Sequence, residues 1–521
     1  MKPSGRAADD RALVAVDVGT GGARAVAIDL EGRVIAEVRR AYPTREPGPG
    51  WAEQNPDDWS ERAAQALTAL GRLLGRRHRA IAIGLTGQCP TVAPFDAQGH
   101  PVGPGMLYRD NRAIDEAREM RDRIGVEAMH RRTGHVAEAF HVGPKVLWLR
   151  RHQPDVFRKT ARFLQPRDVV LRRLGGREAT DETNANATLF FDLRARSWST
   201  DLLADFDLDP TLFPASLAPW TIAGELAPSN GFGFPAGVPI VIGSADSQCA
   251  AFGAGVVDPG PVSEMAGSSS CLNSAVLEPL ADIRVTHYSH VVPNRFSTEL
   301  GVNTAGAAID WAVARLGYPS HAALGTDAGR FHREWAKLGR EAADPVEMAP
   351  LFLPYLGDGE RDDPNLRAAF IGLSSRHDRQ ALAYAVLEGV AFAVWSTLVT
   401  LQQAGAPLDE LRVSGGGGRL ALLSQLKADV LGRPVVDLRH DATAIGAAML
   451  AATACGMQDE ARAAIQKVVA DGRRFDPTPW GREVVAARAS WFERTLREPG
   501  VHAGQSGAVP LAAAASRGGG R

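Results

Sequence analysis

The sequence has few cysteines and no long apolar run. Only four of its 521 residues are cysteine, and none forms a C-x-x-C pair. This spacing argues against a structural zinc site and against the disulfide framework of a secreted domain. No apolar run approaches the length that crosses a membrane, and no N-terminal stretch has the pattern of a signal peptide. We therefore expect a cytoplasmic protein with no membrane partner.

The sequence also lacks a strong charge of either sign. Its 58 lysines and arginines nearly balance its 60 aspartates and glutamates, which gives a formal net charge of −2. Such a balance provides no long-range attraction to nucleic acid, so we expect no nucleic-acid partner. The balanced charge does not exclude small neutral or anionic molecules as ligands. The chain is too long for one ordinary core, and we expect two large domains.

Residues 13–30, LVAVDVGTGGARAVAIDL, place two strand-like apolar runs around a polar, glycine-rich centre. Glycine-rich dipeptides between such runs indicate a β-hairpin. The tip combines backbone amides, a hydroxyl and a carboxylate, which are groups that bind phosphate and Mg²⁺. From this stretch alone, a plain glycine-rich turn remains the alternative.

The rest of the first half alternates predicted helices and strands. A helix with apolar residues at helical spacing begins at Pro56 and Asp57, and we expect Asp57 to cap it. Residues 80–86 form a predicted strand that ends in TGQCP. Residues 239–242 form another, which leads into Asp246 and a helix of small residues. A lone aspartate before a helix is most often an N-terminal cap, so its position does not by itself indicate catalysis.

The second half repeats the design of the first. A second glycine- and serine-rich turn lies between extended segments in VSEMAGSSSCLNSAVL, residues 262–277. Two such hairpins predict a duplicated architecture whose tips face each other. A long helix is predicted from about Ser375 to Ala404. A strand at 411–413 then leads into Ser414 and four glycines, which can bring amides close to a ligand; a flexible turn is the alternative.

Other site motifs are incomplete, and the end of the chain has no regular pattern. The sequence has no G-x-x-x-x-G-K-[ST] loop, and GFGFPAG at 231–237 lacks the G-x-G-x-x-G spacing. His287 and His290 form an H-x-x-H pair without a further ligand nearby, so we interpret them as loop histidines. Alanine, glycine and serine dominate residues 501–521, which we expect to be a disordered tail.

Several motifs, in this order, resemble those of the FGGY family of carbohydrate kinases, most closely its xylulokinase-like members. They are VDVGT (16–20), GWAEQNPDDW (50–59), TGQ (86–88), DNRA (110–113), TDETNA (180–185), GSADSQCAAFGAG (243–255), LPYLGDGER (353–361), LEGVAF (387–392) and SGGGGRL (414–420). The resemblance implies an α/β fold, the duplicated actin-like (ribonuclease-H-like) ATPase fold, with two domains around a central cleft. We place the N-terminal FGGY domain at 11–252 and the C-terminal domain at 253–492.

The resemblance also implies roles for individual residues. Asp246 matches the catalytic base that takes the proton of the sugar hydroxyl, and Asp17 matches the acid that holds Mg²⁺. The positions that match ATP-binding segments are Gly19, Thr20, Gly21, Gly267, Ser268, Asn303, Gly415, Gly416 and Gly417. The positions that match sugar-binding segments are Gln88, Cys89, Pro90, Asp110, Arg112, Phe140, His141 and Asp246. A salt bridge remains the alternative for Arg112, and an exposed loop position for His141.

The sequence departs from its relatives on the sugar side. Xylulokinases typically continue TGQ with Met-His-Gly, and glycerol kinases have Arg-Glu there, whereas this chain has Cys89-Pro90-Thr91. In the second hairpin Ser268 replaces a threonine and keeps its hydroxyl, while Ser270 stands where many relatives have glycine. The sugar specificity is therefore not inherited with the family.

The expected activity is ATP-dependent phosphorylation of a ketose or polyol at a terminal hydroxyl, with ATP and Mg²⁺ as cofactors. The expected partner is a small sugar or polyol, not strictly D-xylulose, and a homodimer is left open. One alternative is a sugar-independent ATPase of the same fold. The other is a non-catalytic sensor that binds ATP and sugar. Asp17 and Asp246 argue against the sensor, whereas the altered Cys89-Pro90 segment keeps it open.

Overall fold

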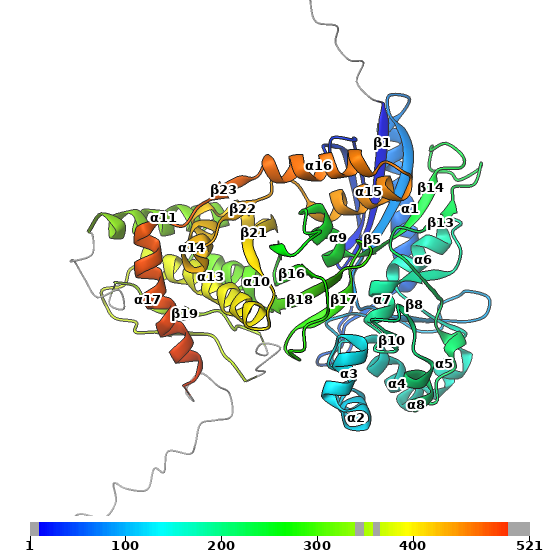
Figure 1. Cartoon of the computed structure of the whole chain (residues 1–521), viewed down its shortest axis with the longest axis horizontal. Helices are drawn as coiled ribbons and strands as arrows, with labels where there is room; N and C mark the ends of the chain where they lie inside the picture. The colour runs from blue at the N-terminus through cyan, green and yellow to red at the C-terminus, as the bar shows by residue number, and fades with distance from the viewer. Residues whose placement is uncertain (1–9, 339–347, 358–364, 499–521) are drawn as a thin grey trace, which may run out of the picture.

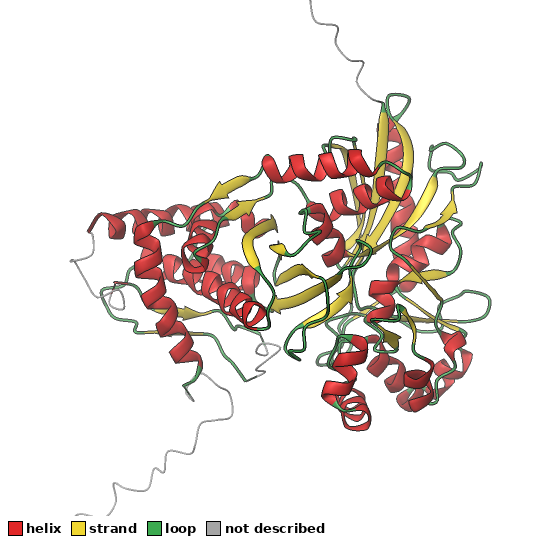
Figure 2. Ribbon diagram, in the orientation of Figure 1, coloured by secondary structure: helices red, strands yellow, loops and turns green. Residues whose placement is uncertain are grey.

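The computed structural model describes residues 10–338, 348–357 and 365–498. Each half of the chain builds one large β-sheet, and helices cover the faces of both sheets (Figures 1 and 2). The tail predicted at 501–521 lies outside the described residues.

The first sheet contains the predicted N-terminal hairpin. Its strands, in spatial order, are β13 (Ile222–Glu225), β14 (Pro239–Ala245), β5 (Arg79–Gly87), β1 (Arg11–Gly19), β2 (Gly22–Ile28) and β3 (Val34–Ala41). β1 and β2 are antiparallel and pair from Leu13 with Ile28 down to Gly19 with Gly22. β5 is parallel to β1, and β14 is parallel to β5. The hairpin and the strands predicted at 80–86 and 239–242 are confirmed.

The second sheet has the same arrangement. Its strands, in spatial order, are β17 (Thr286–Ser289), β18 (Phe296–Val302), β16 (Ser270–Val276), β15 (Gly260–Ala266), β21 (Leu408–Gly415), β22 (Val435–Asp437) and β23 (Arg473–Phe475). β15 and β16 form an antiparallel hairpin, β21 is parallel to β15, and β22 is parallel to β21. The series β14-β5-β1-β2-β3 thus corresponds to β22-β21-β15-β16-β18, and the predicted duplication is confirmed.

The remaining elements surround the two sheets. The helices of the first half are α1 (Pro56–Leu74), α2 (Ile114–Ile124), α3 (Val126–Thr133), α4 (Val142–His152), α5 (Pro154–Lys159), α6 (Pro166–Arg173), α7 (Glu182–Asn186), α8 (Thr200–Asp205) and α9 (Asp246–Gly253). Those of the second half are α10 (Ala305–Arg315), α11 (His321–Leu338), α13 (Arg379–Gln403), α14 (Ala421–Leu431), α15 (Ala442–Ala454), α16 (Gln458–Ala470) and α17 (Pro479–Leu496). Short strands are β4 (Glu53–Gln54), β6 (Ala93–Phe95), β7 (Gly105–Met106), β8 (Arg162–Leu164), β9 (Ala179–Asp181), β10 (Phe191–Asp192), β11 (Ser197–Trp198), β12 (Ala215–Leu217), β19 (Leu351–Leu353) and β20 (Ala369–Ile371); the 3₁₀ turns are Pro210–Leu212 and Gly416–Arg419.

Two helix predictions need comment. α1 begins at Pro56 as expected, but its cap is Asn55, whose side chain accepts a hydrogen bond from the backbone N–H of Asp57 at 3.2 Å. Asp57 lies inside the first turn, where its negative charge interacts favourably with the positive end of the helix dipole. The helix predicted at 375–404 is α13. By length and composition it is apolar enough to cross a membrane, so the expectation that no apolar run approaches this length is wrong. However, 72% of its most apolar stretch is buried inside the protein, as in a core helix.

Helix α15 joins the two halves because it packs on β1 and β5 of the first sheet and against α9. Glycines allow these elements to approach closely. A Cβ atom added to Gly84 of β5 would lie 2.1 Å from the carbonyl oxygen of Ala447, and one added to Gly446 would lie 1.8 Å from that of Cys249. The first sheet therefore shares a core with a helix from the second half. The domain ranges 11–252 and 253–492 stay a prediction.

Candidate active site

Gln54 connects the first hairpin tip to the TGQ segment. Its Nε2 donates to the carbonyl oxygen of Thr20 at 2.7 Å. Its Oε1 accepts from Trp59 Nε1 at 2.8 Å and from Gln88 Nε2 at 2.9 Å. Gln88 thus supports the tip that contains Gly19, Thr20 and Gly21. Sequence reasoning did not select Gln54, although it lies within the GWAEQNPDDW motif.

Asp17 lies opposite Arg24 in the hairpin register. Arg24 Nη2 donates to Asp17 Oδ2 at 3.0 Å, and Arg24 Nη1 pairs with Asp441, the N-terminal cap of α15. Burial raises the pKa of Asp17, although the charge of Arg24 opposes this effect. Asp17 Oδ1 is buried and has no hydrogen-bond partner among the described residues. An unpartnered carboxylate oxygen fits a hard cation such as Mg²⁺, or water bound to one.

Asp246 is the first residue of α9, directly after β14. Its Oδ1 accepts from the backbone N–H of Ser247 at 2.8 Å. The capping position is Ala245, and α9 has no side-chain capping bond, so the alternative that Asp246 is an N-cap is wrong. Burial raises the pKa of Asp246 to about 7, and the charge of Asp17 adds to this effect. A carboxyl group with this pKa can exchange a proton near neutral pH.

Cys89 and Pro90 follow Gln88, the first residue after β5, and are joined by a cis peptide bond. Burial raises the pKa of the Cys89 thiol, and the charges of Asp181 and Asp246 contribute, which indicates that Cys89 lies near the predicted base. The buried Lys145 Nζ lies 3.5 Å from the carbonyl oxygen of Pro90 and 2.6 Å from that of Phe140. Lys145 therefore links two of the predicted sugar-side segments. Sequence reasoning missed this lysine, which stands out as a charge within the apolar run VGPKVLWL.

Asp110 and Arg112 form a buried ion pair. Arg112 Nε donates to Asp110 Oδ1 at 2.9 Å, and Arg112 Nη2 donates to Asp110 Oδ2 at 2.6 Å and to Glu53 at 2.7 Å. The guanidinium carbon lies 3.7 Å from the ring centroid of Trp51. The salt-bridge alternative for Arg112 is confirmed, in a buried rather than a surface setting. A sugar-binding role for either residue stays a prediction.

His141 is buried, so the alternative of an exposed loop residue is wrong. Its Nδ1 lies 3.1 Å from the backbone nitrogen of Glu138, which donates to it, and its Nε2 lies 3.2 Å from His135 Nδ1. Its ring stacks on Phe140 with 4.2 Å between centroids. The protein thus fixes the orientation of both Phe140 and His141 next to Lys145, and their contact with a sugar stays a prediction.

The predicted nucleotide segments of the second half gather at the ends of β15 and β21. Gly415 pairs with Ala266, and a Cβ atom at Gly415, which has φ +91°, would lie 2.6 Å from the carbonyl oxygen of Ala266. The same addition at Gly417 would lie 2.6 Å from Ala266 Cβ. Gly415 and Gly417 are therefore required for close packing on β15, so this segment is more than a flexible turn, whereas a Cβ atom at Gly416 would meet nothing within 4 Å.

The loop of the second hairpin contacts the start of α10. Ala307 donates its backbone N–H to the carbonyl oxygen of Ser268 at 2.9 Å, and a Cβ atom at Gly306 would lie 2.1 Å from the carbonyl oxygen of Gly267. Asn303 lies just before α10 and is exposed. The ATP-side residues predicted in this half therefore lie together.

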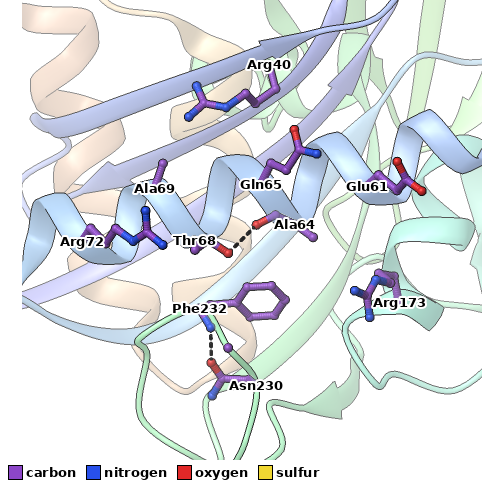
Figure 3. Close-up of a pocket in the computed structure, with 11 residues that line it drawn as sticks. Arg40, Glu61, Ala64, Gln65, Thr68, Ala69, Arg72, Arg173, Asn230 and Phe232 are labelled. Carbon is purple, nitrogen blue, oxygen red and sulfur yellow. Dashed lines mark hydrogen bonds between the residues drawn. The ribbon is translucent and has the colours of Figure 1, made fainter.

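Two motifs are incomplete as site motifs in the sequence, the H-x-x-H pair at His287 and His290 and the segment GFGFPAG at 231–237. They lie away from this site or hold no metal-binding group. His287 lies within β17 and His290 directly follows it, and both are buried, so their interpretation as loop histidines is wrong. No group of three or more histidine, cysteine or acidic residues able to hold a metal occurs in the described ranges. Gly231 and Phe232 line a hollow of about 600 Å³ beside α1, shown in Figure 3. The hollow contains none of the predicted site residues.

Comparison with known proteins identifies the family. Residues 12–253 match the N-terminal domain of the FGGY family of carbohydrate kinases, and residues 263–455 match its C-terminal domain. The chain belongs to the FGGY family. It is an ATP-dependent carbohydrate kinase, as the motifs predicted, and the non-catalytic sensor is not favoured.

The similar proteins include two kinds of kinase. The chain is 30% identical over 449 residues to a xylulose kinase of Escherichia coli strain K12, which covers 84% of this chain and 89% of that protein. It is 30% identical over 509 residues to a glycerol kinase of Alkalilimnicola ehrlichii. This match covers 94% of this chain and 98% of the glycerol kinase. The solved xylulose kinase from Rhodospirillum rubrum superposes with a TM-score of 0.83 at 29% identity, covering 93% of this chain and 99% of that one. These matches confirm the actin-like α/β fold and a xylulokinase-like sugar kinase.

Proposed function

We propose that this FGGY kinase transfers the γ-phosphoryl group of ATP to a terminal hydroxyl of a ketose or polyol, with Asp246 as the general base. The observation that carries the proposal is the half-buried Asp246 carboxyl at the start of α9, directly after β14, whose pKa is raised to about 7. A base with a pKa near the working pH is effective in proton transfer.

The reaction needs one proton acceptor and otherwise depends on positioning. The Asp246 carboxylate accepts the hydroxyl proton as the sugar oxygen forms a bond to the γ-phosphorus. The bond from that phosphorus to the bridging oxygen breaks, and ADP leaves. Mg²⁺, when bound, neutralises phosphate charge. Asp17 is the residue that would hold it, since its Oδ1 accepts no hydrogen bond within the part of the chain that the structure describes.

We propose further that the substrate is not strictly D-xylulose. Cys89 and Pro90 occupy the place where xylulokinases have methionine and histidine. Proline has no polar side-chain atom and a thiol is a weak donor, so the hydrogen bonds of the histidine are lost. The loss of a matched polar contact in a buried site changes selectivity by orders of magnitude. The chain is equally identical to a xylulose kinase and to a glycerol kinase, which supports a substrate that is either a ketose or a polyol and is not strictly D-xylulose.

The test is ADP release measured with Mg²⁺-ATP across D-xylulose, L-xylulose, D-ribulose, erythritol and glycerol. We expect sugar-dependent turnover, with kcat/KM highest for a compound other than D-xylulose. Turnover without any sugar would identify an ATPase and would overturn the proposed function. If D-xylulose gave the highest kcat/KM, only the specificity proposal would be wrong.

We also propose that the protein is cytoplasmic, and we keep a homodimer as a prediction. All four cysteines are free thiols. Free thiols suit a reducing compartment, which supports the cytoplasmic location proposed from the sequence. A homodimer also stays a prediction, which sedimentation of the purified protein tests directly.

A further inference from the structure

Glu299 brings a carboxylate from the second sheet to the predicted base. It lies on β18, where it pairs with Asn273 of β16. Its Oε2 accepts from Ser247 Oγ at 2.8 Å and from Asn273 Nδ2 at 3.3 Å. Ser247 directly follows Asp246 in α9, so the Ser247–Glu299 hydrogen bond joins the two halves of the chain next to the base.

Glu299 has an unusual electrostatic setting. It is only 9% exposed, and no lysine, arginine or histidine in the described ranges forms an ion pair with it. Its charge instead acts on other acidic groups: with burial and Asp17 it raises the pKa of Asp246, and with burial and Asp181 it raises the pKa of the Cys89 thiol. A nearly buried carboxylate without a cation is costly unless hydrogen-bond donors surround it. Here Ser247 and Asn273 both donate their hydrogen bonds to the Oε2 atom of Glu299.

The other carboxylate oxygen is left for a ligand. Glu299 Oε1 accepts no hydrogen bond from any described residue, whereas Oε2 is fixed by Ser247 and Asn273. ATP carries several negative charges, and a carboxylate at this place repels them. A sugar or polyol carries neutral hydroxyl donors, which match a carboxylate acceptor.

We propose that Glu299 is a specificity-determining residue that accepts a hydrogen bond from a second hydroxyl of the bound sugar or polyol. This inference rests on the proposed function. The hydroxyl that is phosphorylated faces Asp246, and a neighbouring hydroxyl of the same substrate donates to Glu299. The substrate is then held from both sheets, and compounds with hydroxyls at both positions are preferred.

The test combines Glu299→Gln with the substrate analogue that lacks one hydroxyl. For the compound with the highest kcat/KM in the panel above, the variant should lose about 10–100-fold in kcat/KM, as expected for a hydrogen bond to a charged group. One monodeoxy analogue should be used equally by wild type and variant, because the partner hydroxyl is already missing. Glu278→Gln is the control, since Glu278 is an exposed glutamate paired with Arg194. It should leave every rate unchanged.

Other outcomes of this experiment would overturn either the role of Glu299 or the proposed function. An unchanged kcat/KM, or an equal loss with every monodeoxy analogue, would overturn the role of Glu299 in recognition. A raised Mg²⁺ requirement in the variant would place Glu299 on the metal side and would also overturn it. If Glu299→Gln does not fold, Ser247→Ala, which frees the carboxylate, should show a smaller loss with the same analogue pattern. If wild type phosphorylated no sugar, the proposed function would fall, and Glu299 recognition with it.

Discussion

Asp17 and Arg24 face each other across the first hairpin, with Arg24 Nη2 3.0 Å from Asp17 Oδ2. Because Arg24 also binds Asp441 at the start of α15, one guanidinium links the predicted metal-binding acid to the second half of the chain. Asp246 and Asp441 stand at equivalent places in the duplicated fold, at the start of the helix that follows the last parallel strand. The duplication therefore brings acids from both halves to the same region.

Asp17→Asn should weaken Mg²⁺ binding, so that the reaction needs a higher Mg²⁺ concentration. The substitution keeps the volume of the side chain and removes the charge that a hard cation prefers. We expect the Mg²⁺ concentration for half-maximal rate to rise by roughly tenfold or more. Glu37→Gln is the matched control, because Glu37 is a more exposed carboxylate 3.7 Å from the same arginine. An equal rise in both variants would contradict the assignment of Asp17.

Asp246→Asn should abolish proton removal while leaving ATP binding close to wild type. Asparagine can still accept the bond from the backbone of Ser247, but it cannot take a hydroxyl proton. General-base catalysis contributes ~10²–10⁴-fold, so kcat at saturating sugar should fall by about that factor. Retention of more than roughly a tenth of the wild-type kcat would remove Asp246 from the base role.

The pH dependence should follow Asp246. Its carboxyl must be ionised to act as a base, and its pKa in the folded protein is about 7. We therefore expect kcat/KM to fall about tenfold per pH unit below pH 7 and to level off above it. The measurement is kcat/KM from pH 5 to 9 at saturating Mg²⁺-ATP. A profile that stayed flat down to pH 5 would mean that the acting base has an ordinary carboxyl pKa.

The same pKa predicts an effect on stability. The pKa of Asp246 rises from 3.8 in the unfolded chain to about 7 in the folded protein, so the folded state binds more protons between these values. Stability therefore decreases as pH rises through this range. Asp246→Asn should raise the free energy of unfolding at pH 8 by ~1–4 kcal/mol and change it little at pH 4. Thermal unfolding at both pH values measures this, and a variant less stable at pH 8 would contradict it.

Gln54→Leu should damage both stability and nucleotide binding. The change leaves Trp59 Nε1 without its acceptor and frees the Thr20 carbonyl at the hairpin tip. Buried groups without partners cost about 1–3 kcal/mol each, so we expect a loss of roughly 2–4 kcal/mol and a higher KM for ATP. Gln65→Leu on the exposed face of α1 is the control. Equal effects from both variants would show that the Gln54 network has no special role.

The sequence by itself determined the local elements and the family. Hairpins at 13–30 and 262–277, the helix from Pro56 and the glycine run after Ser414 follow from periodicity and turn residues, which act over a few neighbouring positions. Where local rules compete, one helix boundary differs from the prediction: Asn55 rather than Asp57 caps α1.

Only the tertiary structure decided which side chains share the site. Glu299 and Ser247 are 52 positions apart, Arg24 and Asp441 are 417 apart, and Lys145 reaches Pro90 across 55. No periodicity connects such positions. The burial that changes the pKa of Asp246 and Lys145 comes from packing of elements drawn from the whole chain. Desolvation and charge act through space, so they are determined only when the sheets and helices have assembled.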